Sequence, residues 1–241
     1  MTNVVLLNNI DHHDLRVVTR HAAAYGDAVN LAAIFPTEFE DVQREYPILF
    51  RSDAGGAIQA VALLGLDRDE NLFLGEGGWQ GRYVPAILRR GPFSIGLREE
   101  EAGGQIRREP MIHVDLDDPR VSREEGEPVF LQHGGNAPYL DHVAGVLRTL
   151  YSGMEVAGPM FAAFDALGLI QPVEIEVSLN DEESYQLPDF LTIAQDRLAD
   201  LDGASLEQLN RQGYLRLAFL AAASLANVGR LIELKNRMRA A

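Results

Sequence analysis

The chain has 241 residues, 46% of them hydrophobic and 24% charged, which is typical of a folded globular protein and argues against disorder or low-complexity sequence. Its 36 acidic and 21 basic residues give a formal net charge of −15, which disfavours nucleic acid or anionic lipid as a partner. The absence of cysteine excludes disulfides, thiolate metal ligands and cysteine nucleophiles.

The first ten residues lack the basic start and long apolar stretch of a signal peptide. The most apolar window, residues 214–229, contains Arg216, Ser224 and Asn227 and is shorter than the roughly 20 residues that a bilayer span needs. We therefore expect a cytoplasmic protein with no membrane span, although export without a cleaved signal, and hence surface association, stays open.

Alternation of apolar and polar residues predicts several strands in the first two-thirds of the chain. Residues 57–64 are apolar on both faces except at Gln59, as in an interior strand. Residues 111–117 and 173–179 each present one apolar and one polar face. Shorter candidates are residues 47–50 and 93–97, and glycine pairs at 55–56, 77–78, 103–104 and 134–135 predict turns.

Helical patterns lie between these strands and dominate the end of the chain. A capping-box pattern at Thr37 and Glu40 predicts a short helix, and a second one at Ser205 and Gln208 predicts another.

Prolines mark the start of two further predicted helices. Apolar residues recur with helical spacing after Pro138 and again after Pro159, and Gly168 ends the second helix. A long apolar helix is then predicted over residues 214–238, and its apolar surface indicates burial.

The order of these elements predicts an α+β fold, with a mainly antiparallel sheet, flanking helices and a long buried C-terminal helix. We expect one domain over residues 1–241, strand-rich over 1–195 and helical over 196–241. Two charged segments, residues 98–109 and 117–128, are predicted to be loops within that domain. The small residues 221–224 fit either burial within one subunit or a homodimer interface.

A metal site is one interpretation of His113 and Asp115, which project from the same face of a predicted strand. With a third ligand from His133 or His142 they would resemble the two-histidine, one-carboxylate set of non-haem iron enzymes. Ordinary polar residues on an exposed strand face are the simpler interpretation. The cluster at residues 11–14, Asp-His-His-Asp, is interpreted in the same way, as a solvated turn.

Motifs for nucleophilic catalysis and nucleotide binding are absent from the sequence. No serine lies in a G-x-S-x-G turn, no G-x-x-x-x-G-K-[ST] loop occurs, and Lys235 is the single lysine. The sequence predicts no cofactor, leaves enzymatic activity open, and favours binding over catalysis.

The segment 76–93 departs most from average composition, because it combines the one tryptophan of the chain with further aromatic rings and three arginines. Such residues offer large contact areas and directional donors, so they fit a surface that recognises a protein partner or a small anionic ligand. The alternative is a short helix over 83–90 with the aromatic rings in the core. The candidate recognition residues are Trp79, Arg82, Tyr83, Arg89, Arg90 and Phe93.

The sequence also resembles the bacterial SapC family. The resemblance is carried in order by residues 38–50 (Glu-Phe…Tyr-Pro-Ile-Leu-Phe), 62–73, 79–93 (Trp…Arg-Tyr-Val-Pro-Ala…Arg-Arg-Gly-Pro-Phe), 128–134, 167–172 and 224–231. In the family a glycine usually precedes the aromatic residue of a late strand, whereas here Asp189 precedes Phe190.

Membership implies no established catalytic residues. The family name is linked to a bacterial surface array, so a structural surface-layer component is one alternative; a similarly named permease does not fit a chain without a membrane span. We expect a soluble, non-catalytic accessory or binding protein, with a metal-dependent enzyme using His113 and Asp115 as the other alternative.

Overall fold

The computed structural model describes residues 3–53, 55–102, 105–179 and 184–240, which form two compact units. Unit 1 contains Met1–Asp27 and Ala86–Tyr151, and unit 2 contains Ala28–Pro85 and Ser152–Ala241. The strand ladders are antiparallel in both units, which confirms the predicted α+β class. The prediction of one domain stays a prediction, and each unit is described by itself.

Unit 1 is built around a three-stranded sheet in the order β1-β9-β8, and its core includes Phe93, Val114 and Val143, none of them accessible to solvent. A smaller sheet has the order β10-β2-β11. The elements are β1 (Val4–Leu6), β2 (Arg16–Val17), η1 (Ala23–Tyr25), α2 (Ala86–Arg89), β8 (Phe93–Ala102), β9 (Gln105–Asp115), β10 (Val121–Ser122), β11 (Glu127–Pro128) and the first half of α3 (Pro138–Ala166).

The loop predicted over residues 98–109 is wrong, because β8 and β9 pair along this segment as a hairpin. The backbone register sets Arg98 opposite Glu109, Glu99 opposite Arg108 and Glu100 opposite Arg107. The loop was predicted from the charge content of the segment, which does not by itself exclude strand pairing. The turn predicted at 103–104 lies outside the described residues. The segment 117–128 is mostly turn, as predicted, with the short strand β10 inside it and β11 at its end.

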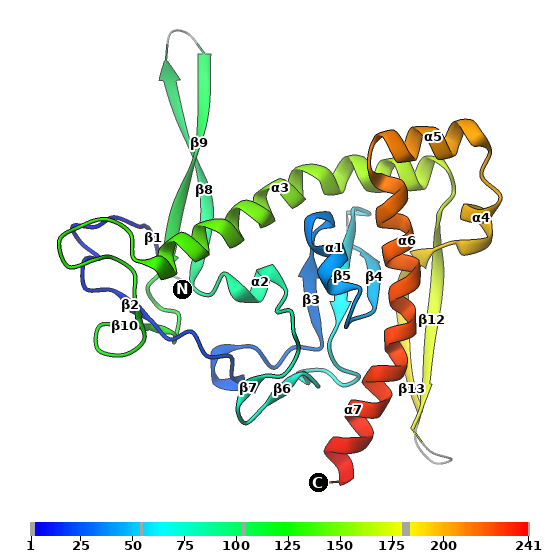
Figure 1. Cartoon of the computed structure of the whole chain (residues 1–241), viewed down its shortest axis with the longest axis horizontal. Helices are drawn as coiled ribbons and strands as arrows, with labels where there is room; N and C mark the ends of the chain where they lie inside the picture. Colours follow the sequence, from blue (N-terminus) through cyan, green and yellow to red (C-terminus); the bar gives the residue numbers. More distant parts are fainter. Residues whose placement is uncertain (1–2, 54, 103–104, 180–183, 241) are drawn as a thin grey trace. The chain divides into compact units, whose positions relative to one another are not determined.

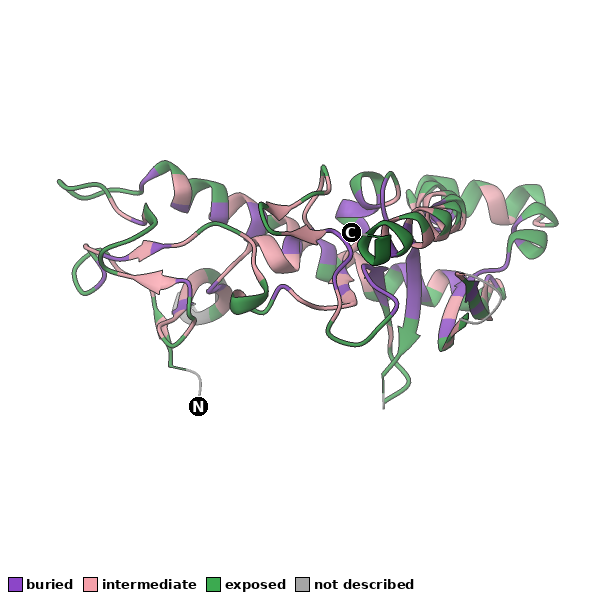
Figure 2. Cartoon of the chain, turned by 90° about the horizontal axis from the view of Figure 1, so that it is seen from below, coloured by how far each residue is buried: buried purple, intermediate pink, exposed green. Residues whose placement is uncertain are grey.

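Unit 2 is built on a five-stranded antiparallel sheet in the order β12-β13-β4-β5-β3. The predicted interior strand is confirmed: β5 lies between β4 and β3, and its last four residues are buried. Figure 2 shows buried residues, in purple, on both strands and helices. The strands are β3 (Leu31–Ile34), β4 (Ile48–Ser52), β5 (Ile58–Leu63), β12 (Ile170–Ser178) and β13 (Ser184–Ile193), with a separate ribbon of β6 (Leu74–Gly75) and β7 (Gly78–Trp79).

Helices accompany this sheet, and α6 runs beside β4 and β13 (Figure 1). They are η2 (Pro36–Glu38), α1 (Phe39–Val42), the second half of α3, α4 (Gln195–Ala199), α5 (Gly203–Arg211), α6 (Tyr214–Ser224), η3 (Leu225–Asn227) and α7 (Val228–Ala240). Burial of large side chains such as Phe39, Phe50 and Phe164, each worth roughly 1.5–3 kcal/mol, provides the main stabilisation of the unit.

Both predicted capping boxes are displaced in the structure. Glu38 rather than Glu40 accepts the hydrogen bond from the Phe35 N–H, at 3.0 Å. Asp202 rather than Ser205 caps α5, by accepting from the Ser205 N–H at 2.7 Å. Each helix thus begins up to three residues before the predicted start: Glu38 is the third residue of η2 and bonds back to its N-cap, and Asp202 is itself the N-cap of α5.

Two separate helices were predicted after Pro138 and Pro159. This is wrong, because the two segments form one helix, α3, which continues through Pro159. A proline inside a helix removes one backbone donor, but the residues after it, Met160, Phe161 and Phe164, are buried in unit 2. Their burial keeps the second half of the helix in place. The predicted start at Pro138 and the end before Gly168, whose φ is +66°, are confirmed.

The predicted C-terminal helix is confirmed as the sequence of α6, η3 and α7, and it is buried along one face. Ala221 and Ser224 on this face are inaccessible to solvent, whereas Phe219 is 56% exposed. Among the described residues this is the one helix long and apolar enough to cross a membrane by length and composition. That finding does not test the expected absence of a membrane span, and the possible homodimer is also untested, so both stay predictions.

Candidate functional site

Two buried glutamates flank α1 and hold the loop that follows β7. Glu38 is 1% exposed; its second carboxylate oxygen accepts from the Tyr83 hydroxyl at 2.8 Å. Glu45 is 3% exposed and accepts from the backbone N–H groups of Arg82, at 2.6 Å, and Tyr83, at 3.0 Å. A buried carboxylate needs such donors, so these bonds fix residues 82 and 83 against the end of α1.

The hydroxyl of Tyr46 makes two further hydrogen bonds that fix the same loop. The Tyr46 hydroxyl donates to the Tyr83 carbonyl and accepts from the Trp79 indole N–H at 3.1 Å. Burial raises the pKa of Tyr46 above its usual value, so this hydroxyl keeps its proton and its role as a donor. A Cβ at Gly81 would lie 2.3 Å from the Tyr46 hydroxyl oxygen, so this position admits no side chain without a shift.

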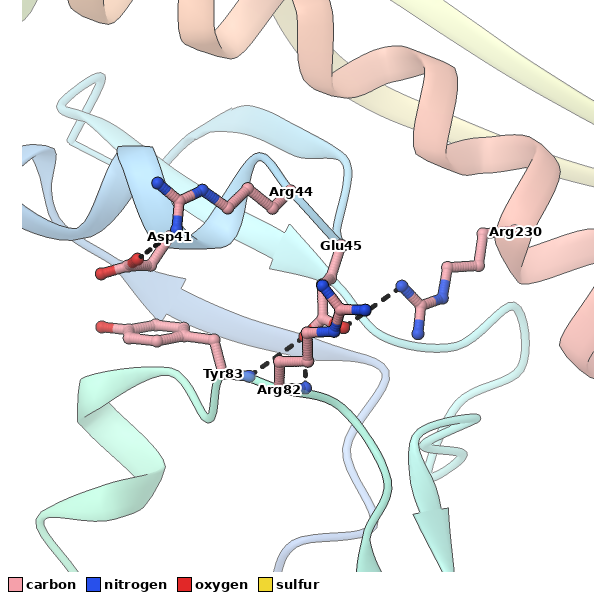
Figure 3. Close-up of a pocket in the computed structure, with 6 residues that line it drawn as sticks. All are labelled: Asp41, Arg44, Glu45, Arg82, Tyr83 and Arg230. Atoms are coloured by element: carbon pink, nitrogen blue, oxygen red, sulfur yellow. Dashed lines mark hydrogen bonds and ion pairs between the residues drawn. The ribbon is translucent and has the colours of Figure 1, made fainter.

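The fixed loop forms one wall of a pocket of about 450 Å³ within unit 2 (Figure 3). Three separated parts of the sequence supply its arginines: Arg44 follows α1, Arg82 follows β7 and Arg230 lies on α7. The complete lining is Asp41, Arg44, Glu45, Arg82, Tyr83 and Arg230.

Two of the three guanidinium groups already have carboxylate partners. Arg44 lies 3.4 Å from Asp41 and 3.2 Å from Glu40, both about half exposed. Arg230 donates to the buried carboxylate of Glu45 at 3.2 Å, and its guanidinium lies over the ring of Phe73.

Arg82 differs from these two arginines. Its side chain is exposed, and within the part of the chain that the structure describes its guanidinium has no hydrogen-bond or ion-pair partner. Guanidinium groups bind carboxylates and phosphates through two parallel hydrogen bonds. The pocket can therefore bind an anionic group at Arg82.

The predicted recognition residues fall into two groups. Trp79, Arg82 and Tyr83 lie together in unit 2, where Trp79 supports the loop and the other two line the pocket. Arg89, Arg90 and Phe93 belong to unit 1.

The unit 1 group has structural contacts. Phe93 is fully buried and packs edge-on against Tyr139, and Arg90 donates to the Phe93 carbonyl at 2.7 Å. Burial lowers the pKa of Arg90. Arg89 lies on α2 and is partly buried. A role of these three residues in recognition stays a prediction.

Two of the candidate metal ligands, His113 and Asp115, have local partners. His113 lies on β9 with its ring against Gly96, and Asp115 accepts from the backbone N–H groups of Asn3 and Asp117, both at 3.1 Å. His133 and His142 are exposed. No group of three His, Asp or Glu side chains suited to a metal occurs among the residues described. The metal-dependent enzyme stays an untested alternative.

Residues 11–14 form a turn, as predicted, but His12 is buried, so the prediction of a solvated turn is wrong at that residue. The imidazoles of His12 and His13 lie 3.1 Å from the carbonyls of Asn8 and Ile10, and Asp14 pairs with Arg123. These contacts explain the cluster without a ligand.

Four pocket residues were not predicted from the sequence: Asp41, Arg44, Glu45 and Arg230. Glu45 and Arg230 are 185 positions apart, so no local pattern connects them. The one available signal was a glutamate next to the buried Tyr46-Pro47 pair, which is too common to indicate a site.

Comparison with known proteins identifies the family to which the chain belongs. The SapC family profile matches residues 7–231, which include the whole pocket, and the chain therefore belongs to the SapC family. No curated protein matches the chain. No solved structure matches it either.

Proposed function

We propose that this SapC-family chain is a non-catalytic binding protein that acts in the cytoplasm and receives an anionic group in the pocket around Arg82. The observation that carries the proposal is the exposed guanidinium of Arg82 beside Arg44 and Arg230, in a protein whose net charge is −15. A local excess of positive charge on an acidic protein attracts an anion to one place.

The composition of the pocket supports binding rather than chemistry. Its described lining contains arginines, carboxylates and one tyrosine, without a serine, threonine, histidine or lysine as nucleophile or base. The Tyr83 hydroxyl donates to Glu38, and the Glu45 carboxylate accepts three hydrogen bonds. These groups hold the wall in place for recognition.

A thermal-shift screen with anionic metabolites and acidic peptides tests the proposal, because a ligand that binds the native state raises the melting temperature. We expect at least one compound to raise the melting temperature of the wild type and to have no effect on Arg82→Gln. Arg211→Gln is the matched control, since Arg211 is an exposed arginine of unit 2 that pairs with Glu207 on α5. The proposal is wrong if no compound stabilises the wild type, or if Arg82→Gln responds equally.

A further inference from the structure

The charges that line the pocket limit how much negative charge a ligand can bring. In the described lining, three arginines face the two carboxylates of Asp41 and Glu45, which leaves an excess of one positive charge. Arg230 is held by Glu45, and Arg44 is held by Asp41 and by Glu40 outside the lining. One unpaired guanidinium therefore matches one monoanionic group.

A dianion is disfavoured at the same place. The buried carboxylate of Glu45 accepts from the backbone of Arg82 itself, so a fixed negative charge lies close to the binding group. Like charges repel strongly where water is partly excluded, and a second negative charge on the ligand would meet Glu45 and Asp41 without a further free cation.

The size of the pocket indicates that the ligand extends beyond its charged group. A volume of about 450 Å³ falls in the range of sites for small organic molecules and far exceeds what an inorganic ion fills. Tyr83 contributes an aromatic ring to the wall, as Figure 3 shows, and its hydroxyl hydrogen is donated to Glu38. An organic body can pack against that wall while its charged end meets Arg82.

From this combination we infer that the pocket selects a small organic monocarboxylate, bound by its carboxylate to the Arg82 guanidinium. The inference rests on the proposed function and narrows it from anionic ligands in general to one chemical class. A planar carboxylate accepts two parallel hydrogen bonds from a guanidinium, which satisfies both groups without displacing the partners of Arg44 or Arg230.

Three probes of nearly equal size separate the charge states: benzoate, benzamide and phenyl phosphate, titrated by calorimetry at neutral pH. We expect benzoate to bind at least about tenfold more tightly than neutral benzamide, the value of a charge-assisted hydrogen-bond pair. We also expect benzoate to bind more tightly than phenyl phosphate. Acetate, which lacks the organic body, should bind more weakly than benzoate.

Variants connect these preferences to named residues. Arg82→Gln should lose the benzoate affinity by at least about tenfold, Arg82→Lys should lose part of it, and Arg211→Gln should leave it unchanged. Asp41→Asn, at a half-exposed position, removes one negative charge from the lining. This variant should have a smaller ratio of benzoate affinity to phenyl phosphate affinity than the wild type.

Tighter binding of phenyl phosphate than of benzoate would overturn the inference, and so would equal binding of benzoate and benzamide. If none of the probes binds while the thermal-shift screen finds an Arg82-dependent ligand of another class, the inference fails and the proposed function stands. If a ligand binds equally well to Arg82→Gln, both fail.

Discussion

Asp189 adopts a backbone conformation that favours glycine, with φ at +65°. It lies in the β13 segment opposite the register shift between Val173 and Ile175, which makes it part of a β-bulge. Glycine is the residue that such bulges prefer, and Asp and Asn tolerate the conformation better than other side chains. This geometry gives a physical reason for the glycine that the resemblance to the SapC family led us to expect at this position.

The conformation of Asp189 leads to a stability prediction. Asp189→Gly should raise the free energy of unfolding by about 0.5–1 kcal/mol, because it relieves the left-handed strain at an exposed site. Urea unfolding followed by circular dichroism measures the change. Asp165→Gly, in the last turn of α3, should instead lower stability, and equal effects of the two substitutions would contradict the assignment of strain to Asp189.

At the scale of elements, one side chain links α6 to the central sheet. The Ser224 hydroxyl oxygen accepts from the Ile48 N–H at 2.8 Å at the start of β4, and its hydrogen is donated to the Ala221 carbonyl at 2.6 Å. Both Ser224 and Ile48 are inaccessible to solvent. The hydroxyl therefore satisfies a backbone donor that no water reaches.

Ser224→Ala should lower the free energy of unfolding by about 1–3 kcal/mol, because the buried Ile48 N–H loses its acceptor. Chemical denaturation of the variant measures this cost. Ser178→Ala, at an exposed position on β12, is the matched control and should change stability by less than about 0.5 kcal/mol. A loss for Ser224→Ala as small as that of the control would show that α6 does not depend on this bond.

Periodic elements could be predicted from the sequence, because their burial repeats along the chain. The strand at 173–179 is confirmed for that reason, whereas the strand at 57–64 and the helix after Gly213 are confirmed because their continuous apolar runs indicated burial. The β8–β9 hairpin could not be predicted, because residues 98–109 show no apolar alternation and their charged, glycine-containing composition is also typical of a loop. The starts of η2 and α5 were also misplaced. The sequence does not show that the carboxylates of Glu38 and Asp202 accept hydrogen bonds from the free backbone N–H groups at these helix ends.

At the scale of the whole molecule, unit 1 contains a buried ion network. Asp27 is inaccessible to solvent and accepts from Arg120 at 2.7 Å and from the Ala22 N–H at 2.9 Å, with the His21 ring at 3.2 Å. Burial by itself would raise the pKa of Asp27, but the His21 hydrogen bond and the charge of Arg120 hold it below the usual value.

The lowered pKa of Asp27 predicts that the protein is less stable in acid than at neutral pH. A carboxyl whose pKa is lower in the folded state stabilises the protein above its unfolded pKa of about 3.9, and this stability is lost as the pH falls through the folded pKa. The melting temperature should therefore fall on acidification below about pH 4. Asp27→Asn should melt at a lower temperature at neutral pH and show a smaller further decrease in acid; an unchanged pH profile would contradict the assignment.

The C-terminal helix leads to a prediction about location. Because α6 packs its Ala221–Ser224 face against the sheet of unit 2, we expect the protein in the soluble fraction of cells lysed without detergent. Fractionation and immunoblotting measure this. Recovery in membranes after a high-salt wash would contradict the expected absence of a membrane span, and recovery at the cell surface would favour the surface-layer alternative.

The candidate site could be predicted only in part. Arg82 and Tyr83 were identified from their composition, because arginines and aromatic rings cluster in residues 76–93. Arg44 and Arg230 reach the same pocket through long-range folding, and Glu45 joins them through a contact across 185 positions. Proximity of that kind leaves no periodic signal in a single sequence.

The most direct measurement is a crystal structure of the protein grown with benzoate. The account predicts a carboxylate in hydrogen-bond contact with the Arg82 guanidinium, inside the pocket, with the Arg230–Glu45 pair intact. Benzoate bound elsewhere, or Arg82 paired with a carboxylate of its own chain in a closed pocket, would contradict it.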